Sequence, residues 1–76
     1  KMTEEKFLSV VSIALEVDAT EIALSTKMYD IENWDSLGQL SILTALDQNT
    51  DGKASSISTL GSMTELAHMF DAVKSL

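Results

Sequence analysis

The stretch Asn33-Trp34-Asp35-Ser36-Leu37-Gly38 marks the point where a loop gives way to an apolar run with helical spacing. Asp, Asn and Ser are the residues that most often begin helices, so we expect a helix to begin at Ser36. The free N–H groups and the positive dipole end of such a helix start are also suited to hold a phosphate. Without further context, the simplest interpretation of Ser36 is an N-cap with no other role.

On its C-terminal side, this stretch leads into an expected helix from Ser36 to Gln48. Leucines recur there every three residues, which predicts a buried stripe. The stripe consists of Leu37, Leu40, Leu43 and Leu46, widened by Ile42 and Ala45. Residues 49–52 (Asn-Thr-Asp-Gly) are typical of a helix stop and turn. Between Ser55 and Leu60 there is room only for one tight helical turn packed on the core.

On its N-terminal side, the stretch ends a long connection that follows a first expected helix. This helix should run from Glu4 to Val17 with Thr3 as its N-cap. Its apolar face is formed by Phe7, Leu8, Val11, Ala14 and Leu15, with Val10 and Ile13 beside it. The connection, residues 18–34, carries apolar anchors that include Trp34. Loops of this length that are pinned on a core are usually functional, and part of this one should form a short helical turn.

A last helix should follow a capping box at Ser62-Met63-Thr64-Glu65, with Ser62 as the N-cap. Its buried face would consist of Met63, Leu66, Ala67, Phe70 and Val73. No alternating strand pattern competes with these helices. We therefore predict an all-α fold, a small antiparallel four-helix bundle of three main helices and a short third helix, forming a single domain over residues 1–76.

The composition limits the classes of partner. The net charge is −7, from 12 acidic and 5 basic residues. Such a chain is repelled by nucleic acids and anionic membranes and is suited to basic protein surfaces. It contains no cysteine, so it has neither a disulfide nor a thiolate metal site. No apolar run reaches transmembrane length and no signal peptide is apparent, so we expect a cytoplasmic monomer.

The order of elements and three local motifs resemble the acyl and peptidyl carrier proteins over nearly the whole chain. The motifs are Val17-Asp18-Ala19-Thr20-Glu21-Ile22, Trp34-Asp35-Ser36-Leu37-Gly38 and Ser62-Met63-Thr64-Glu65-Leu66. The resemblance implies that Ser36 carries a covalent 4′-phosphopantetheine derived from coenzyme A. It also implies a carrier of acyl or aminoacyl thioesters in fatty acid, polyketide or nonribosomal peptide biosynthesis, and not an enzyme.

The same resemblance implies three kinds of partner enzyme. A phosphopantetheinyl transferase would supply Mg²⁺ and coenzyme A, a second enzyme would load the acyl or aminoacyl group, and downstream enzymes would process it. These partners should recognise the Ser36 end of the second helix, through Asp35 and Leu37, and its acidic residue Asp47. No histidine or lysine adjoins Ser36 in sequence, so a separate enzyme must activate its hydroxyl.

The second helix also departs from the family. Fatty-acid carriers usually have an acid at the position of Gly38 and several more along this helix, whereas Asp47 is its only acid here. These departures favour a stand-alone carrier from a specialised pathway. Met28 and Met63 are candidates to line an adaptable apolar cavity for a bound acyl chain, and His68 should lie at the surface.

The alternative is a small acidic protein-binding module, with or without weak calcium binding at residues Asp47–Ser58. This segment matches the opening of an EF-hand loop, including Gly52 at the sharp turn. The match then fails, because Ser58 stands where a bidentate glutamate should close the site and Ala54 replaces a bulky apolar residue. A turn is therefore the favoured interpretation of this segment, and no metal ligand is assigned.

Overall fold

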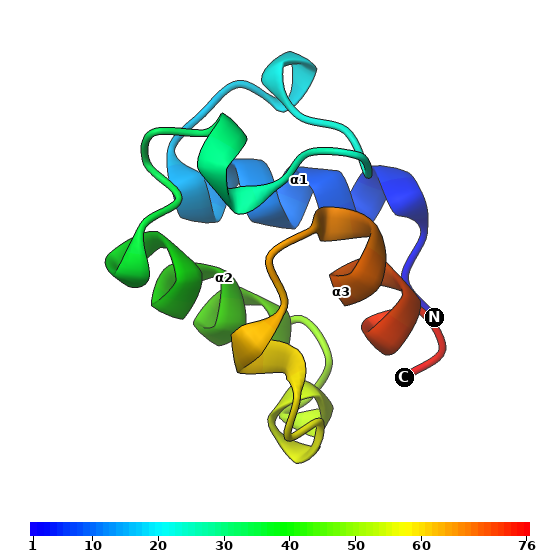
Figure 1. The fold of residues 1–76 in the computed structure, drawn as a ribbon. Coiled ribbons are helices and arrows are strands. Elements are labelled where there is room, and N and C mark those ends of the chain that lie inside the picture. Colours follow the sequence, from blue (N-terminus) through cyan, green and yellow to red (C-terminus); the bar gives the residue numbers. More distant parts are fainter.

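The computed structural model describes residues 1–76 and is all-helical (Figure 1). It contains three α-helices, α1 (Glu4–Leu15), α2 (Ser36–Gln48) and α3 (Leu66–Val73), and four 3-10 turns, η1 (Ala19–Glu21), η2 (Met28–Asp30), η3 (Lys53–Ser56) and η4 (Leu60–Ser62). The all-helical class is confirmed. Two 3-10 turns stand where the short third helix was expected, so a four-helix bundle is not confirmed.

Helix α1 begins as predicted and ends early. The Thr3 hydroxyl accepts a hydrogen bond from the Lys6 N–H at 3.1 Å, which confirms Thr3 as the N-cap. The helix ends at Leu15 and not at Val17. The reason is Glu16, which takes a left-handed conformation with φ of 58°. This conformation turns the chain out of the helix toward the long loop.

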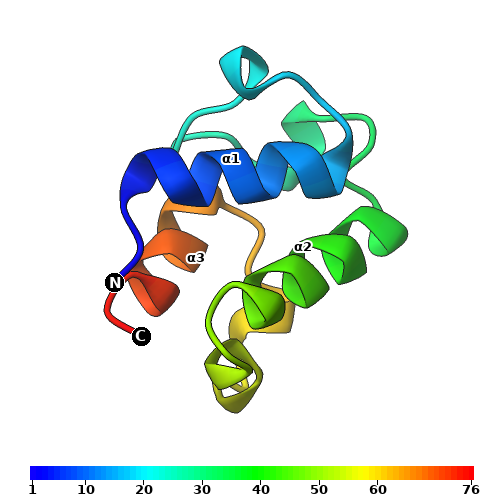
Figure 2. The ribbon, with the colours of Figure 1, turned by 180° about the vertical axis from the view of Figure 1, so that it is seen from behind.

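The core lies where the three helices meet. Helices α1 and α2 run antiparallel, with the end of α1 beside the start of α2 (Figure 2). The rings of Phe7 and Phe70 pack at a centroid distance of 5.3 Å, an aromatic contact that joins α1 to α3. The largest fully buried side chains come from all three helices: Phe7, Val11 and Leu15, then Ile42 and Leu46, then Leu66, Met69 and Val73.

Helix α2 has the predicted bounds, but half of its expected leucine stripe is wrong. Leu37 is 74% exposed and Leu40 is 60% exposed, whereas Ile42 and Leu46 are buried. An α-helix has 3.6 residues per turn, so a row spaced every three residues drifts around it. Over the nine positions from Leu37 to Leu46 this drift amounts to about half a turn. The start of the row therefore faces solvent, as does Ile13 of α1, which is 75% exposed.

The predicted capping box at the start of the last helix is also wrong. Ser62 closes η4, and its hydroxyl donates to the Thr59 carbonyl at 2.9 Å. Helix α3 begins only at Leu66, with Glu65 as an N-cap that makes no side-chain bond. Met63 consequently precedes the helix instead of lying on its buried face, where Met69 takes part in the core.

The long loop provides hydrogen-bond acceptors for the start of α3, which the capping box does not provide. The N–H groups of Leu66 and Ala67 donate to the carbonyls of Thr26 and Leu24, at 3.0 and 2.8 Å. These are the first two N–H groups of α3, which have no partner inside the helix. The loop between α1 and α2 is thereby pinned across the start of α3, close to a single antiparallel bridge between residues 27 and 65.

Candidate functional site

Asp35, and not Ser36, is the N-cap of α2. The Asp35 carboxylate accepts a hydrogen bond from the Gly38 N–H at 2.9 Å, and its carbonyl accepts one from Gln39 at 2.8 Å. Ser36 is the first residue with helical geometry. Ser36 is therefore not the N-cap that the simplest interpretation of the sequence made it.

Ser36 presents an unoccupied hydroxyl at the helix start. The residue is exposed, and its hydroxyl takes part in none of the hydrogen bonds within the chain. The N–H groups of Ser36 and Leu37 also have no protein partner. One hydroxyl and two N–H donors thus face solvent together at the positive end of a thirteen-residue helix, where the dipole favours a negatively charged group.

A buried tryptophan holds the loop that leads to Ser36. Trp34 is 2% exposed, which confirms it as a loop anchor. Its indole N–H donates to the side-chain carbonyl of Gln39, one turn into α2. The Gln39 amide group in turn donates to the carbonyls of Gly61 and Met63, at 3.0 and 2.9 Å. Gln39 therefore joins the loop, α2 and the segment after η4.

Sequence reasoning did not identify Gln39 as part of this site. The only local signal is a glutamine five positions after the single tryptophan. A second link, between the Asn33 side-chain amide and the Leu15 carbonyl at 3.0 Å, ties the loop to the end of α1. Ser36 is thus delivered by a segment that is fixed on both sides, as a pre-organised site requires.

The structure brings two of the three expected recognition residues to Ser36. Asp35 and Leu37 flank it, and the Leu37 side chain projects into solvent. Asp47 lies eleven residues farther along α2, about 16 Å at 1.5 Å per residue. Its carboxylate accepts a hydrogen bond from the Ser55 N–H at 3.1 Å, so Asp47 stabilises η3.

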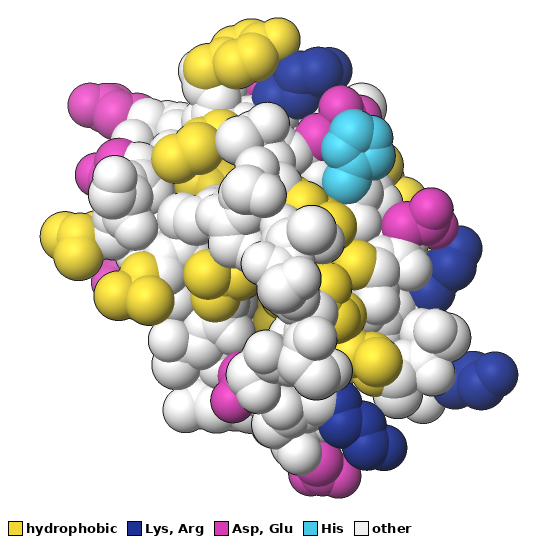
Figure 3. All heavy atoms as spheres, turned by 60° about the horizontal axis from the view of Figure 1, so that its bottom comes forward, with side chains coloured by type: hydrophobic (Ala, Val, Ile, Leu, Met, Phe, Trp, Pro, Cys, Tyr) yellow, Lys and Arg dark blue, Asp and Glu magenta, His cyan; other side chains and the backbone are white.

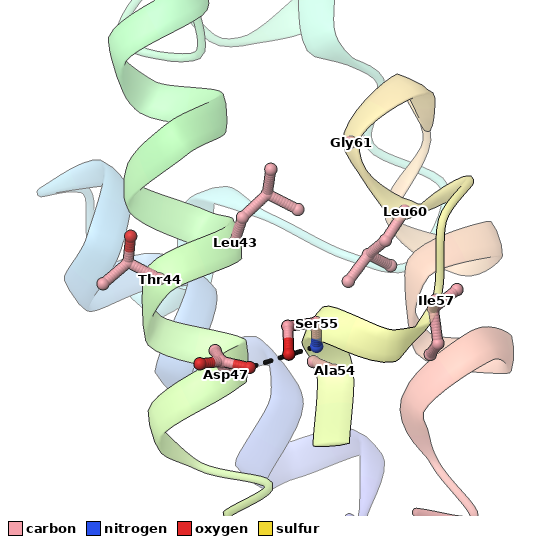
Figure 4. A pocket seen from close by; sticks show the side chains of 8 residues that line it. All are labelled: Leu43, Thr44, Asp47, Ala54, Ser55, Ile57, Leu60 and Gly61. Atoms are coloured by element: carbon pink, nitrogen blue, oxygen red, sulfur yellow. Dashed lines mark hydrogen bonds between the residues drawn. The ribbon is translucent and has the colours of Figure 1, made fainter. Parts of the chain in front are cut away.

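A hollow of about 340 Å³ lies between α2 and the segment that contains η3 and η4 (Figure 4). Leu43 and Leu60 lie across it from one another, and the Asp47–Ser55 hydrogen bond closes its lower end. Neither Met28 nor Met63 lines it. None of the other hollows is lined by these methionines either, so the structure does not show the cavity that was expected of them.

The segment from Asp47 to Ser58 forms a turn. Asp51 and Gly52 both have positive φ, 54° and 79°, and the Gly52 N–H donates to the Asp47 carbonyl at 2.9 Å. Nowhere in the chain do three or more His, Cys, Asp or Glu side chains gather in a way that could hold a metal ion. The turn interpretation of this segment is the one that the backbone geometry supports.

Neither Asp30 nor His68 makes a hydrogen bond to Ser36. The Asp30 carboxylate accepts a hydrogen bond from the Lys27 N–H at 2.9 Å, which occupies it at the start of η2. His68 is exposed on α3, as expected. No lysine or histidine side chain makes a hydrogen bond to the Ser36 hydroxyl.

Comparisons of the chain with protein-family models, with curated proteins and with solved structures found no match. None of the helices is both long and apolar enough to cross a membrane.

Proposed function

We propose that this chain is a carrier protein that holds acyl or aminoacyl groups as thioesters on a 4′-phosphopantetheine arm attached to Ser36. One observation carries the proposal. The Ser36 hydroxyl is exposed and unbonded because Asp35 performs the capping that a serine at this position would otherwise perform. A redundant, accessible serine at a helix start fits covalent modification better than a structural role.

The free N–H donors support the same proposal. A phosphodiester on the Ser36 oxygen would place its negative charge next to the N–H groups of Ser36 and Leu37, which have no other partner. Charge of this sign is stabilised at a helix N-terminus. The chain has no cysteine, so the thiol needed for a thioester would come from the arm.

The site fits a passive role. A serine hydroxyl needs a base before it attacks phosphorus, and none contacts Ser36. We therefore assign activation to a separate Mg²⁺-dependent phosphopantetheinyl transferase that uses coenzyme A. Loading and downstream enzymes would then act on the attached group while the carrier itself catalyses nothing.

The hollow beside α2 offers a place for an apolar cargo. Leu43 lies seven residues after Ser36, about 10 Å along the helix, and contributes to its wall together with Ile57 and Leu60. In the proposed carrier arrangement, η3 and η4 take the place of the short third helix of the family. The segment that they form would be the one that moves to admit a chain.

The surface of α2 supports a specialised pathway over primary fatty-acid synthesis. Asp47 is the only acid within the helix, and its carboxylate is used internally. On the face seen from the η3 side, apolar and uncharged side chains occupy most of the surface and charged ones lie mainly at its edges (Figure 3). Partner enzymes would consequently contact few acidic side chains along this helix.

Mass spectrometry tests the proposal directly. After incubation with coenzyme A, Mg²⁺ and a broad-specificity phosphopantetheinyl transferase, the intact chain should gain the mass of one phosphopantetheinyl group. Ser36→Ala should abolish the gain. Ser41→Ala is the matched control, because Ser41 is also an exposed serine on α2, and it should be modified as completely as the parent chain.

Two outcomes would contradict the proposal. No mass gain with a transferase that modifies a known carrier in the same tube would remove the carrier function. A gain that persists in Ser36→Ala would move the attachment to another serine. In the first case the acidic protein-binding module would become the leading interpretation.

A further inference from the structure

Three large apolar side chains that α1 and α2 would ordinarily bury are exposed on one side of the molecule. Ile13 is 75%, Leu37 74% and Leu40 60% exposed. They border a groove between the two antiparallel helices. Part of this groove has a volume of about 400 Å³ and walls that include Ile13, Ala14, Leu40, Ser41, Thr44 and Gln48.

The groove continues to the start of α2. A second hollow shares Ala14 and Ser41 with the first and reaches Leu37. The combined groove therefore lies between α1 and α2 and extends from Gln48 to Leu37. Its apolar borders suit the apolar face of an amphipathic helix laid into it.

The charges are arranged by position along the groove. Its middle is uncharged, although the chain has 17 charged residues in total, 12 acidic and 5 basic. The end near Ser36 carries Glu16 and Asp35. Beyond the opposite end, next to Asn49, lie Lys1 and Lys6. The groove thus has an uncharged middle and an acidic end, and two lysines line a separate hollow beyond its other end.

We propose that this groove docks an amphipathic helix of a partner protein. The chemistry of that helix follows from the groove: an uncharged leucine-rich stripe in the middle, a lysine or arginine toward Glu16 and Asp35, and an acid toward Lys1 and Lys6. The apolar stripe supplies affinity, and the charges at the two ends fix the orientation. The proposal goes beyond the carrier function, because the unmodified chain is sufficient for it.

A second copy of the chain fits the groove less well than such a helix. In a twofold dimer the groove and the surface that fills it would both have to belong to one self-complementary patch. Each copy also carries a net charge of −7, so the two would repel one another. A helix from a different protein has neither disadvantage.

Two synthetic helical peptides test the groove on the unmodified chain. The first carries a leucine stripe, a lysine pair at one end and a glutamate pair at the other. The second has the same composition with the leucines distributed around the helix. In ¹H–¹⁵N NMR titrations, the first should shift Ile13, Leu40 and Gln48 saturably, and the second should not. The titration can use either the modified or the unmodified chain, so its result does not depend on whether Ser36 carries an arm.

Variants identify the contacts. Leu40→Ser should weaken binding of the first peptide at least about tenfold, which corresponds to about 1.4 kcal/mol. Tyr29→Ser is the matched control, since Tyr29 is 84% exposed and does not line the groove, and should leave the affinity unchanged. Glu16→Lys should weaken binding at low salt, and the difference should shrink at high salt.

Several results would overturn the proposal. These are no saturable shifts with the first peptide, equal shifts with both peptides, or an affinity that Leu40→Ser does not change. Shifts of the groove residues that grow with protein concentration in the absence of peptide would assign the groove to a second copy instead.

Discussion

The carbonyl oxygen of Asn33 occupies the space that a side chain on Gly38 would need. A Cβ atom built on Gly38 would lie 2.2 Å from this oxygen and 3.0 Å from a methyl carbon of Leu15. The loop before Ser36, the end of α1 and the first turn of α2 therefore meet at one glycine. This close approach allows the loop to deliver Ser36 to the helix start.

Gly38→Ala should destabilise the fold. Since the obstacle is a backbone atom, the loop would have to shift, at a cost of about 1–3 kcal/mol in the free energy of unfolding. Helix propensity alone would favour alanine by up to about 1 kcal/mol, so the sign of the change identifies the clash. Urea denaturation measures it. Gly61→Ala is the control, because its Cβ would make an ordinary contact with Leu43 at 3.6 Å; a similar loss in both variants would contradict this explanation.

The packing also gives a structural reason for a glycine at position 38, which the sequence context did not give. An acid at this position distinguishes the fatty-acid carriers, and the glycine favoured a specialised carrier. In this structure any side chain at residue 38 would meet the Asn33 carbonyl. Gly38 is thus explained by packing alone, and the support for a specialised pathway comes from the remaining surface of α2, which is poor in acids.

The division of roles between Asp35 and Ser36 predicts that their substitutions affect stability unequally. Asp35→Ala should lower the free energy of unfolding by about 1 kcal/mol, because the Gly38 N–H loses its cap. Asp35→Asn retains a capping oxygen and should cost less. Ser36→Ala should change stability by less than about 0.5 kcal/mol, since its hydroxyl is unbonded. A loss in Ser36→Ala as large as that in Asp35→Ala, measured by urea denaturation, would show that the serine is structural.

Local signals were sufficient to predict α2. The Asp-Ser cap, the apolar run and the Asn-Thr-Asp-Gly stop all lie within one segment, and the helix has the predicted bounds. The same signals could not predict which face of α2 is buried. The leucine spacing of three drifts around the helix, and only the position of α1 decides that Ile42 and Leu46, and not Leu37, are covered.

The start of α3 could not be predicted from nearby residues. Its first N–H groups donate to Thr26 and Leu24, which precede Leu66 by about 40 positions. A capping box at Ser62 satisfies the local pattern. The Thr64 carbonyl, however, accepts a hydrogen bond from the Met28 N–H of the long loop, and the helix begins only at Leu66. The position of Gln39 under Trp34 is likewise a tertiary relationship, with only a weak trace in the sequence.

Gln39→Ala should destabilise the loop that positions Ser36. The Trp34 indole N–H, which is buried, would lose its partner, and two backbone carbonyls would lose their donor. An unsatisfied buried donor costs about 1–3 kcal/mol. Unfolding followed by the fluorescence of this single tryptophan measures the loss. Gln48→Ala, at the exposed end of α2, is the control and should change stability by less than about 0.5 kcal/mol; equal losses would remove Gln39 from the support of Ser36.

Acid should weaken the fold through two aspartates. Hydrogen bonds from the backbone and then the hydroxyl of Thr20 lower the pKa of Asp18 below its ordinary value of 3.8, and the hydrogen bond and charge of Lys74 lower the pKa of Asp71. A carboxyl whose pKa is lower in the folded state contributes stability that is present above its unfolded pKa and is lost as pH falls through the folded pKa.

The free energy of unfolding should therefore decrease as pH falls below about 4. In urea denaturation from neutral to acidic pH, Asp18→Asn should make this decrease shallower. Thr20→Val should make it shallower by a smaller amount, because it removes the hydroxyl bond to Asp18 and leaves the backbone bond. A parent chain and an Asp18→Asn variant with the same slope would show that this carboxylate does not couple folding to pH.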